Sequence, residues 1–361
     1  MPYYHSSYKR NTVKKRNPFR TFFIVLFIMV ILFGAVAAYL GYNVVYSPNV
    51  WTENEEGQFL YISNDDTFDD IKTQLYANGN IIHRKNFELL AEYKKYPENI
   101  KPGRYAIQNG MNNNDLINLL RIGEQEPVKL MFNNIRLKED FANRIAEQID
   151  IDAEDLLRKL NDSSFAKSMG FSLETIKSMF LPNTYFIYWN TSTDDFLKRM
   201  KYEYDQFWTE ERINLALQRD LSPIEVSILA SIIEKETQKN DEKARIAGVY
   251  LNRLESGWRL QADPTLVYAL GDFNIKRVLN VYKEIDSPYN TYKYSGLPPG
   301  PICIPSISSI NAVLNAEDHS YFFFCARPDY SGYHNFAKTS TQHINNANAY
   351  REFLNKEKIY K

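Results

Sequence analysis

The sequence predicts an α+β fold that follows an N-terminal transmembrane helix. An uncharged stretch at residues 21–40 predicts the membrane helix, and short strand-like runs alternate with capped helices in the next part of the chain. The remainder is mainly helical with turn-rich segments, and 361 residues suffice for two or three compact domains. We therefore expect a basic tail at 1–20, a transmembrane helix at 21–42, a small α+β module at 47–126 and a mainly helical α+β domain at 127–355.

The membrane helix is the first expected element. Residues 1–20 contain six Lys or Arg and no acid, and "TFFIVLFIMVILFGAVAAYL" follows without a charge. Twenty apolar residues span about 30 Å as a helix, the thickness of a bilayer's hydrocarbon core. The basic flank predicts a cytoplasmic N-terminus and places the rest of the chain outside. A cleaved signal peptide is the alternative, since Ala35 and Ala37 form a small-residue pair, but the apolar run exceeds the usual core of about 7 to 15 residues.

Composition restricts the function classes. Acidic and basic residues almost balance, with a formal net charge of −1, so no chain-wide field favours nucleic acid as a partner. The 26 Tyr and 22 Phe residues suit ring-lined grooves as well as cores. Cys303 and Cys325 form no disulfide framework; one bridge and two buried thiols both remain open.

Two segments precede the region that carries the chemistry. In the module at 47–126, "FLYI" and "GRYAI" predict strands, and Thr67 or Asp66 is expected to open a helix. In the region from 127 to 220, helical patterns are broken by "FLPNTYFIYWNTST". This aromatic segment is interpreted either as a packed hydrophobic loop or as the wall of a groove.

The stretch "SPIEVSILASIIEKET" predicts a helix with two glutamates near its end. Ser222 is the expected N-cap, Pro223 the first helical residue, and Glu225 completes a capping box. At about 100° per residue from Leu229, Glu236 lies within the apolar stripe, whereas Glu234 lies on the opposite face. Glu236 is therefore expected to point inward and Glu234 to face solvent.

An inward carboxylate has two explanations. One is a buried ion pair, since buried acids are rarely tolerated unpaired. The other is a general acid whose pKa is raised by burial, the group needed to protonate a glycosidic oxygen. An ordinary glycosidase also needs a second carboxylate, and Asp263 in "QADPTLVYAL" is the nearest candidate, although Asp followed by Pro first indicates a helix N-cap.

Five motifs resemble those of the endolytic murein transglycosylases, also called YceG-like proteins. They are "ASIIEKET" (230–237), "GVYLNRL" (248–254), "RLQADPT" (259–265), "YNTYKYSGLPPGPI" (289–302) and "HNFAKT" (334–339). The chain departs from many relatives at Lys177, Ser178 and Asn183, which flank or lie in the aromatic segment.

The resemblance implies a site and an activity. The second glutamate of the Glu-Lys-Glu-Thr motif, Glu236, would be the catalytic acid, and the residues lining the groove would be Gln261, Asp263, Asn290, Thr291 and Tyr292. The family members cut nascent peptidoglycan glycan strands internally and leave 1,6-anhydro-N-acetylmuramic acid ends. No metal or organic cofactor is implied, and His319, His334 and His343 are interpreted as ordinary hydrogen-bonded histidines.

The resemblance also implies a location and partners. Family members are single-pass proteins of the bacterial inner membrane with a cytoplasmic N-terminus, a LysM-like module at the position of 47–126 and an extracytoplasmic catalytic domain at that of 127–355. The expected partners are peptidoglycan strands and membrane-bound peptidoglycan synthases, with no nucleic acid. Two alternatives stay open: a muramidase that hydrolyses the same bond with Asp263 as second carboxylate, and a non-catalytic peptidoglycan-binding scaffold.

Overall fold

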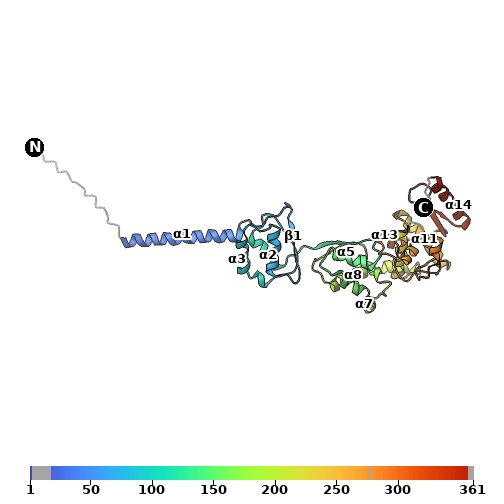
Figure 1. Ribbon diagram of the computed structural model, residues 1–361, viewed down its shortest axis with the longest axis horizontal. Coiled ribbons are helices and arrows are strands. Elements are labelled where there is room, and N and C mark those ends of the chain that lie inside the picture. Colours follow the sequence, from blue (N-terminus) through green and yellow to red (C-terminus); the bar gives the residue numbers. More distant parts are fainter. Residues whose placement is uncertain (2–17, 276–277, 357–361) are drawn as a thin grey trace. The chain divides into compact units, whose positions relative to one another are not determined.

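The computed structural model describes residues 1, 18–275 and 278–356 (Figure 1). The chain divides into two compact units, Met1–Glu126 and Pro127–Lys361. Helices dominate both units and every sheet has two strands, which confirms the predicted α+β class. Most of the predicted basic tail, residues 2–17, lies outside the described residues.

The apolar segment forms one continuous helix, α1 (Pro18–Tyr46). None of its 29 residues is buried, although Val44 and Val45 at its end pack against the core of the first unit. At 1.5 Å per residue the helix is about 43 Å long, more than a hydrocarbon core requires. In the described part of the chain, α1 alone is long and apolar enough to cross a membrane. It therefore fits a single-pass anchor.

The first unit packs helices against a two-stranded antiparallel sheet in which Leu60 lies opposite Tyr105. Thr67, one of the two expected starting residues, caps the first helix after the membrane segment with a capping box, and Asn112 caps the last. Both predicted strands are present. The elements are β1 (Gln58–Ile62), α2 (Phe68–Ala77), α3 (Arg84–Tyr93), η1 (Tyr96–Glu98), β2 (Gly103–Ile107) and α4 (Asn113–Ile122).

The second unit is mainly helical and contains two antiparallel sheets of two strands each within its described residues, β3–β4 and β5–β6. Its elements begin with β3 (Val128–Met131), α5 (Lys138–Ala146), α6 (Ala153–Leu160), α7 (Ser163–Ser168), η2 (Ile176–Met179), β4 (Thr184–Ile187), α8 (Thr193–Phe207) and α9 (Glu210–Leu217). They continue with α10 (Pro223–Glu236), α11 (Asn240–Glu255), α12 (Asp263–Leu270), η3 (Asn280–Glu284), α13 (Ile307–Leu314), β5 (Phe323–Ala326), β6 (His334–Ala337) and α14 (Ser340–Lys356).

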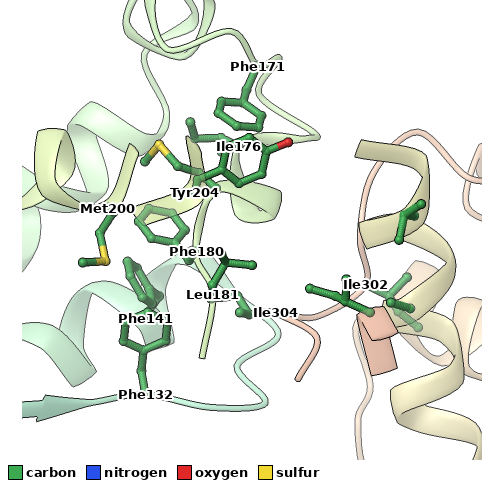
Figure 2. Close-up of a cluster of buried hydrophobic side chains, with 14 of the residues drawn as sticks. Phe132, Phe141, Phe171, Ile176, Phe180, Leu181, Met200, Tyr204, Ile302 and Ile304 are labelled. Carbon is green, nitrogen blue, oxygen red and sulfur yellow. The ribbon is translucent and has the colours of Figure 1, made fainter. Parts of the chain in front are cut away.

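An aromatic cluster forms one part of the core of the second unit. The ring of Phe132 stacks on Tyr185 and meets Phe141 edge-on at 5.1 Å, and Phe180 completes the group (Figure 2). The aromatic segment is therefore packed into the core in part, and its interpretation as the wall of a groove stays a prediction. Tyr185 is buried, whereas its neighbour Phe186 is 61% exposed, because successive side chains of β4 point to opposite faces.

A short extended segment connects this cluster to α10. The Ile304 N–H donates to the Ile135 carbonyl, and the Ile302 N–H donates to the Ser231 hydroxyl of α10 at 3.0 Å (Figure 2). Gly300 lies just before it, where an added Cβ would meet the Glu174 carbonyl oxygen at 2.1 Å, so only glycine fits there. Cys303, in the segment, is a buried free thiol, and Cys325 is also free.

Helix α10 lies at the centre of the second unit. It contacts α9, α11, α12, α13 and η2, and every residue from Val226 to Ile233 is buried. The amphipathic pattern expected from the sequence is therefore absent from this helix, because protein surrounds it on all sides. Both glutamates in its last turn therefore lie among side chains of neighbouring elements.

Candidate active site

Glu236 is the last residue of α10 and lines a cavity of about 250 Å³. The predicted capping box between Ser222 and Glu225 begins the helix, with Pro223 in its first turn. Thr237, the C-cap that follows the last helical residue, has an extended backbone. The negative end of the helix dipole therefore lies next to the carboxyl group of Glu236, which disfavours its charged form.

The environment of Glu236 favours its protonated form. Tyr250 of α11 donates a hydrogen bond from its hydroxyl to Oε1 of Glu236 at 2.6 Å. Burial raises the pKa of Glu236 to about 7, and the negative charge of Asp263 acts in the same direction. The Tyr250 hydrogen bond and the positive charge of Arg253 partly oppose this rise. A carboxyl group with this pKa can both give and take a proton near neutral pH.

Asp263 faces the same cavity, and its predicted role as a helix N-cap is wrong. The N-cap of α12 is Ala262, and Asp263 is the first helical residue. Its Oδ1 instead accepts a hydrogen bond from the Tyr292 hydroxyl at 2.5 Å. Burial and this bond raise the pKa of Tyr292, so the phenol stays protonated. Asp263 is therefore free of a structural capping duty and close enough to influence Glu236.

Glu234 does not face solvent, which corrects the expectation from the helical wheel. Its side chain is 13% exposed and pairs with Lys243 of α11 at 3.1 Å. It also accepts hydrogen bonds from the hydroxyls of Ser306 and Ser309. Burial alone would raise the pKa of Glu234, but these partners outweigh burial and lower it. The wheel failed because α11 and the start of α13 cover the side of α10 on which Glu234 lies.

Several of the predicted groove residues form hydrogen bonds that position the start of α12 and the backbone of Tyr292. Thr291 is buried; its carbonyl accepts from the Gln261 N–H and its hydroxyl accepts from the Ala262 N–H. Asn290 is fully buried and donates to the carbonyls of residues 283 and 285, while its Oδ1 accepts from the Tyr292 N–H. Gln261 is exposed with a left-handed backbone at φ 50°. Among the five predicted groove residues, Asp263 lines the cavity with Glu236. Direct substrate contact stays a prediction for all five.

The sequence analysis missed several residues around Glu236. Tyr250 and Arg253 belong to the quoted "GVYLNRL" motif, and their spacing from Glu236 on a following helix was the signal that could have identified them. Arg253 donates to the carbonyl of Phe322 and to that of Leu260, so it ties α11 to the segment before α12.

Three basic residues near the cavity were also missed. Arg136 and Lys235 line it with Glu236. Lys177 is buried and donates to the Arg136 carbonyl at 2.8 Å and to the Tyr268 hydroxyl at 3.0 Å. Burial lowers the pKa of Lys177 to about 8. Lys177, at which the chain departs from many relatives, therefore helps to hold Arg136 in the wall of the cavity.

The three histidines of the C-terminal region differ in their surroundings. The ring of His319 makes a 2.8 Å hydrogen bond with the Arg245 carbonyl, and His334 pairs with the buried Glu242 at 2.9 Å. These two are hydrogen-bonded as expected. Within the described residues, Nδ1 of His343 is buried without a hydrogen-bond partner, so the expectation fails at that atom. Candidate metal sites of three or more His, Cys, Asp or Glu side chains are absent from the ranges that the structure describes.

Comparison with known proteins gives consistent results. The profile of the YceG-like family matches residues 60–349. An endolytic murein transglycosylase of Streptococcus pneumoniae strain R6 is 25% identical over 84% of this chain and 61% of its own length. One from Bacillus subtilis strain 168 is 28% identical over 76% of this chain and 79% of its own length.

A solved structure also matches. The crystal structure of a YceG-like protein from Listeria monocytogenes superposes with a TM-score of 0.55 at 28% identity, covering 81% of this chain and 99% of that one. The chain spans only 61% of the length of the pneumococcal relatives. Because the family profile covers most of the sequence, from the first strand to the last helix, the chain belongs to the YceG-like family.

Proposed function

We propose that this chain is an endolytic lytic transglycosylase that cleaves the bond between N-acetylmuramic acid and N-acetylglucosamine in nascent peptidoglycan strands. The observation that carries the proposal is the position of Glu236 in a cavity where burial raises its pKa to about 7. Curated relatives named endolytic murein transglycosylase support it.

The proposed reaction uses Glu236 twice. Its protonated carboxyl group first donates a proton to the glycosidic oxygen, because that oxygen leaves poorly without one. The resulting carboxylate then removes the proton from the 6-hydroxyl of the muramoyl residue, and that oxygen bonds to the anomeric carbon. The Tyr250 hydrogen bond keeps one carboxyl oxygen of Glu236 fixed, which leaves the other for the substrate.

Asp263 has a different role in this scheme. Its carboxylate lines the same cavity and is held by the Tyr292 hydroxyl. A negative charge there stabilises the positive charge that develops on the sugar ring in the transition state. Because the 6-hydroxyl belongs to the substrate and is already close to the anomeric carbon, the reaction needs no residue that activates water.

A muramidase is the second candidate. The observation in its favour is the same placement of Asp263, since two carboxyl groups in one cavity are the arrangement that glycoside hydrolysis uses. In that case Asp263 would activate water or attack the sugar. A third possibility, a non-catalytic scaffold, is disfavoured by the raised pKa of Glu236, because a merely structural glutamate gains stability from partners that lower its pKa.

We further propose the cellular arrangement. Helix α1 anchors the chain in the bacterial inner membrane with its N-terminus in the cytoplasm, as the basic residues before the apolar stretch favour. The module at 47–126 is a LysM-like unit that binds glycan, and 127–355 is the catalytic domain. Membrane-bound peptidoglycan synthases are the proposed partners, since their product is the strand that an anchored enzyme meets first.

The chemistry of the new chain ends tests the proposal. Purified glycan strands are digested with the full chain in detergent, and the products are analysed by mass spectrometry before and after borohydride reduction. A transglycosylase leaves 1,6-anhydro-N-acetylmuramic acid ends, which are lighter than hydrolytic ends by one water and resist reduction. Reducible muramic acid ends would instead identify a muramidase. A folded full chain that cleaves nothing would favour the scaffold.

A further inference from the structure

Two positive side chains lie in the cavity of Glu236 without a role in the proposed reaction. Arg136 and Lys235 line the 250 Å³ cavity together with Glu236. The same two side chains and Phe273 also line a second hollow of about 450 Å³. Because the two hollows share three lining residues, they adjoin, and the two cations border both of them.

Neutral groups hold both cations in place. The guanidinium group of Arg136 lies 4.6 Å from the centre of the Phe273 ring, a cation–π distance. The carbonyl of Arg136 accepts the hydrogen bond from buried Lys177, which fixes the backbone there. The amino group of Lys235 donates to the side chain of Asn134, whose backbone has a left-handed φ of 51°. Both positive ends are thus positioned by neutral groups.

Carboxyl groups line the same two hollows, but they form no ion pair with these cations in the part of the chain that the structure describes. Among residues 18–275 and 278–356, neither Arg136 nor Lys235 forms an ion pair with a carboxylate within 4.0 Å. Asp140 is the acidic residue that lines the outer hollow, and Glu236 and Asp263 line the inner one. Burial and the charge of Arg136 lower the pKa of Lys235, while Cys303 and the charge of Glu234 partly oppose this change. Two half-buried cations that border one hollow favour an anion bound between them.

The pair does not serve to adjust the catalytic acid. The positive charge that lowers the pKa of Glu236 is that of Arg253, and neither Arg136 nor Lys235 contributes to that shift. An arginine next to a lysine offers two parallel N–H donors from the planar guanidinium group and a further donor from the ammonium group. This arrangement suits a carboxylate. The muramic acid residue carries its peptide on a lactyl group, so a substrate bound at Glu236 brings carboxylates into this region.

We propose that Arg136 and Lys235 form a subsite for a free carboxylate in the peptide attached to the muramic acid residue bound at Glu236. This inference rests on the proposed function. It makes the chain selective for strands that carry peptides with free acidic groups over strands whose peptides are amidated or removed. The same ligand chemistry is found in the lactyl carboxylate of a peptide-free strand, so the experiment includes that source separately.

Binding to a catalytically inactive chain gives the direct test. The full-length Glu236→Gln variant in detergent is titrated calorimetrically with N-acetylmuramyl-L-alanyl-D-glutamate and with the D-isoglutamine form, which lacks one free carboxylate. We expect the additional change Arg136→Gln or Lys235→Gln to weaken binding of the acid about tenfold and to leave binding of the amide unchanged. Arg136→Lys should retain part of the preference, because it keeps the charge and loses the paired donors.

Two controls complete the binding test. Lys167→Gln removes an exposed cation of the same unit and should change neither affinity. Circular dichroism and the melting temperature establish that each variant is folded. Equal binding of the acid and the amide by the chain with Arg136 and Lys235 intact would overturn the subsite. Equal losses with N-acetylmuramic acid, which carries only the lactyl carboxylate, would overturn its assignment to the peptide.

Cleavage kinetics separate this inference from the proposed function. On strands with free-acid peptides, Arg136→Gln should raise KM about tenfold, and on fully amidated strands it should leave KM unchanged. If the unmodified chain cleaves no strand, the proposed function fails while the binding result still tests the subsite. If the unmodified chain cleaves both strands and Arg136→Gln raises KM equally on both, the subsite fails and the proposed function stands.

Discussion

The two glutamates at the end of α10 show how different surroundings give one side-chain type opposite properties. Glu234 lies beside Lys243 and two serine hydroxyls, and these partners lower its pKa despite burial. Glu236 has one phenol as its partner, and burial raises its pKa to about 7. Partners therefore decide the charge state of each, since both lie inside the protein. The sequence pattern separated the two by exposure, which is the wrong criterion here.

The comparison also predicts opposite contributions to stability. A carboxyl group whose folded pKa lies above its unfolded value of about 4.5 costs stability as pH rises through that window, because the unfolded chain loses its proton first. A carboxyl group with a lowered pKa, such as Glu234, adds stability above the unfolded value and loses it as the pH falls. The raised pKa of Glu236 therefore lowers stability near and above neutral pH, whereas the lowered pKa of Glu234 increases it.

Glu236→Gln gives the largest expected effect. Loss of a general acid should lower the rate of strand cleavage by about 100-fold to 10,000-fold. The amide avoids the buried charge, so above pH 7 the variant should be more stable than the parent, by up to about 3 kcal/mol. Strand cleavage and urea unfolding at pH 8 measure both. Unfolding of this variant, or full activity, would remove Glu236 from the role of acid.

Glu234→Gln should chiefly affect stability. The change leaves the 5% exposed Lys243 without its carboxylate, and breaking one side of a buried ion pair costs about 3 to 5 kcal/mol. Urea unfolding at pH 7 measures the loss, and the double variant Glu234→Gln with Lys243→Met should recover part of it. At a temperature at which circular dichroism shows the variant to be folded, strand cleavage should continue. A stable but inactive Glu234→Gln variant would transfer the catalytic role to Glu234.

The sequence alone predicted the local structure well. The helix start at Thr67, the capping box at Ser222 and the strands around Leu60 and Tyr105 all occur where the residue types indicate them. These features depend on interactions between residues close in the chain, so the sequence specifies them directly. The α+β class follows from the same signals.

Tertiary neighbours could not be read from the sequence. The partners of Glu234 come from α11 and from the start of α13. Ser306, at the start of α13, is more than 70 residues away in the sequence. Tyr292 reaches Asp263 across 29 residues and replaces the capping role that Asp-Pro indicates. A helical wheel assumes that one face of a helix packs on a core and the other faces solvent. Protein surrounds α10 on all sides, so the apolar pattern could not predict which of its residues are exposed.

Tyr250→Phe should alter the pH dependence of cleavage. The Tyr250 hydrogen bond lowers the pKa of Glu236, so its removal should raise that pKa by roughly one unit, the equivalent of about 1.4 kcal/mol. The alkaline limb of kcat/KM, which follows loss of the proton from Glu236, should move to higher pH. A pH profile on purified strands between pH 5 and 9, roughly the range around that limb, gives the measurement. An unchanged limb would mean that another group controls it.

Asp263→Asn should give the smallest shift and the opposite sign. The negative charge of Asp263 raises the pKa of Glu236 less than burial does, so neutralising it should move the alkaline limb of kcat/KM to lower pH by a fraction of a unit. Asn keeps an oxygen that can accept the hydrogen bond from Tyr292, so the loop before α12 should stay in place. Together with Tyr250→Phe, this variant therefore tests whether the two neighbours of Glu236 act on it in opposite directions. The same variant distinguishes the two candidate reactions. A transglycosylase should still form 1,6-anhydro ends, more slowly. A muramidase that relies on Asp263 should form reducible ends at a rate lower by about 100-fold or more.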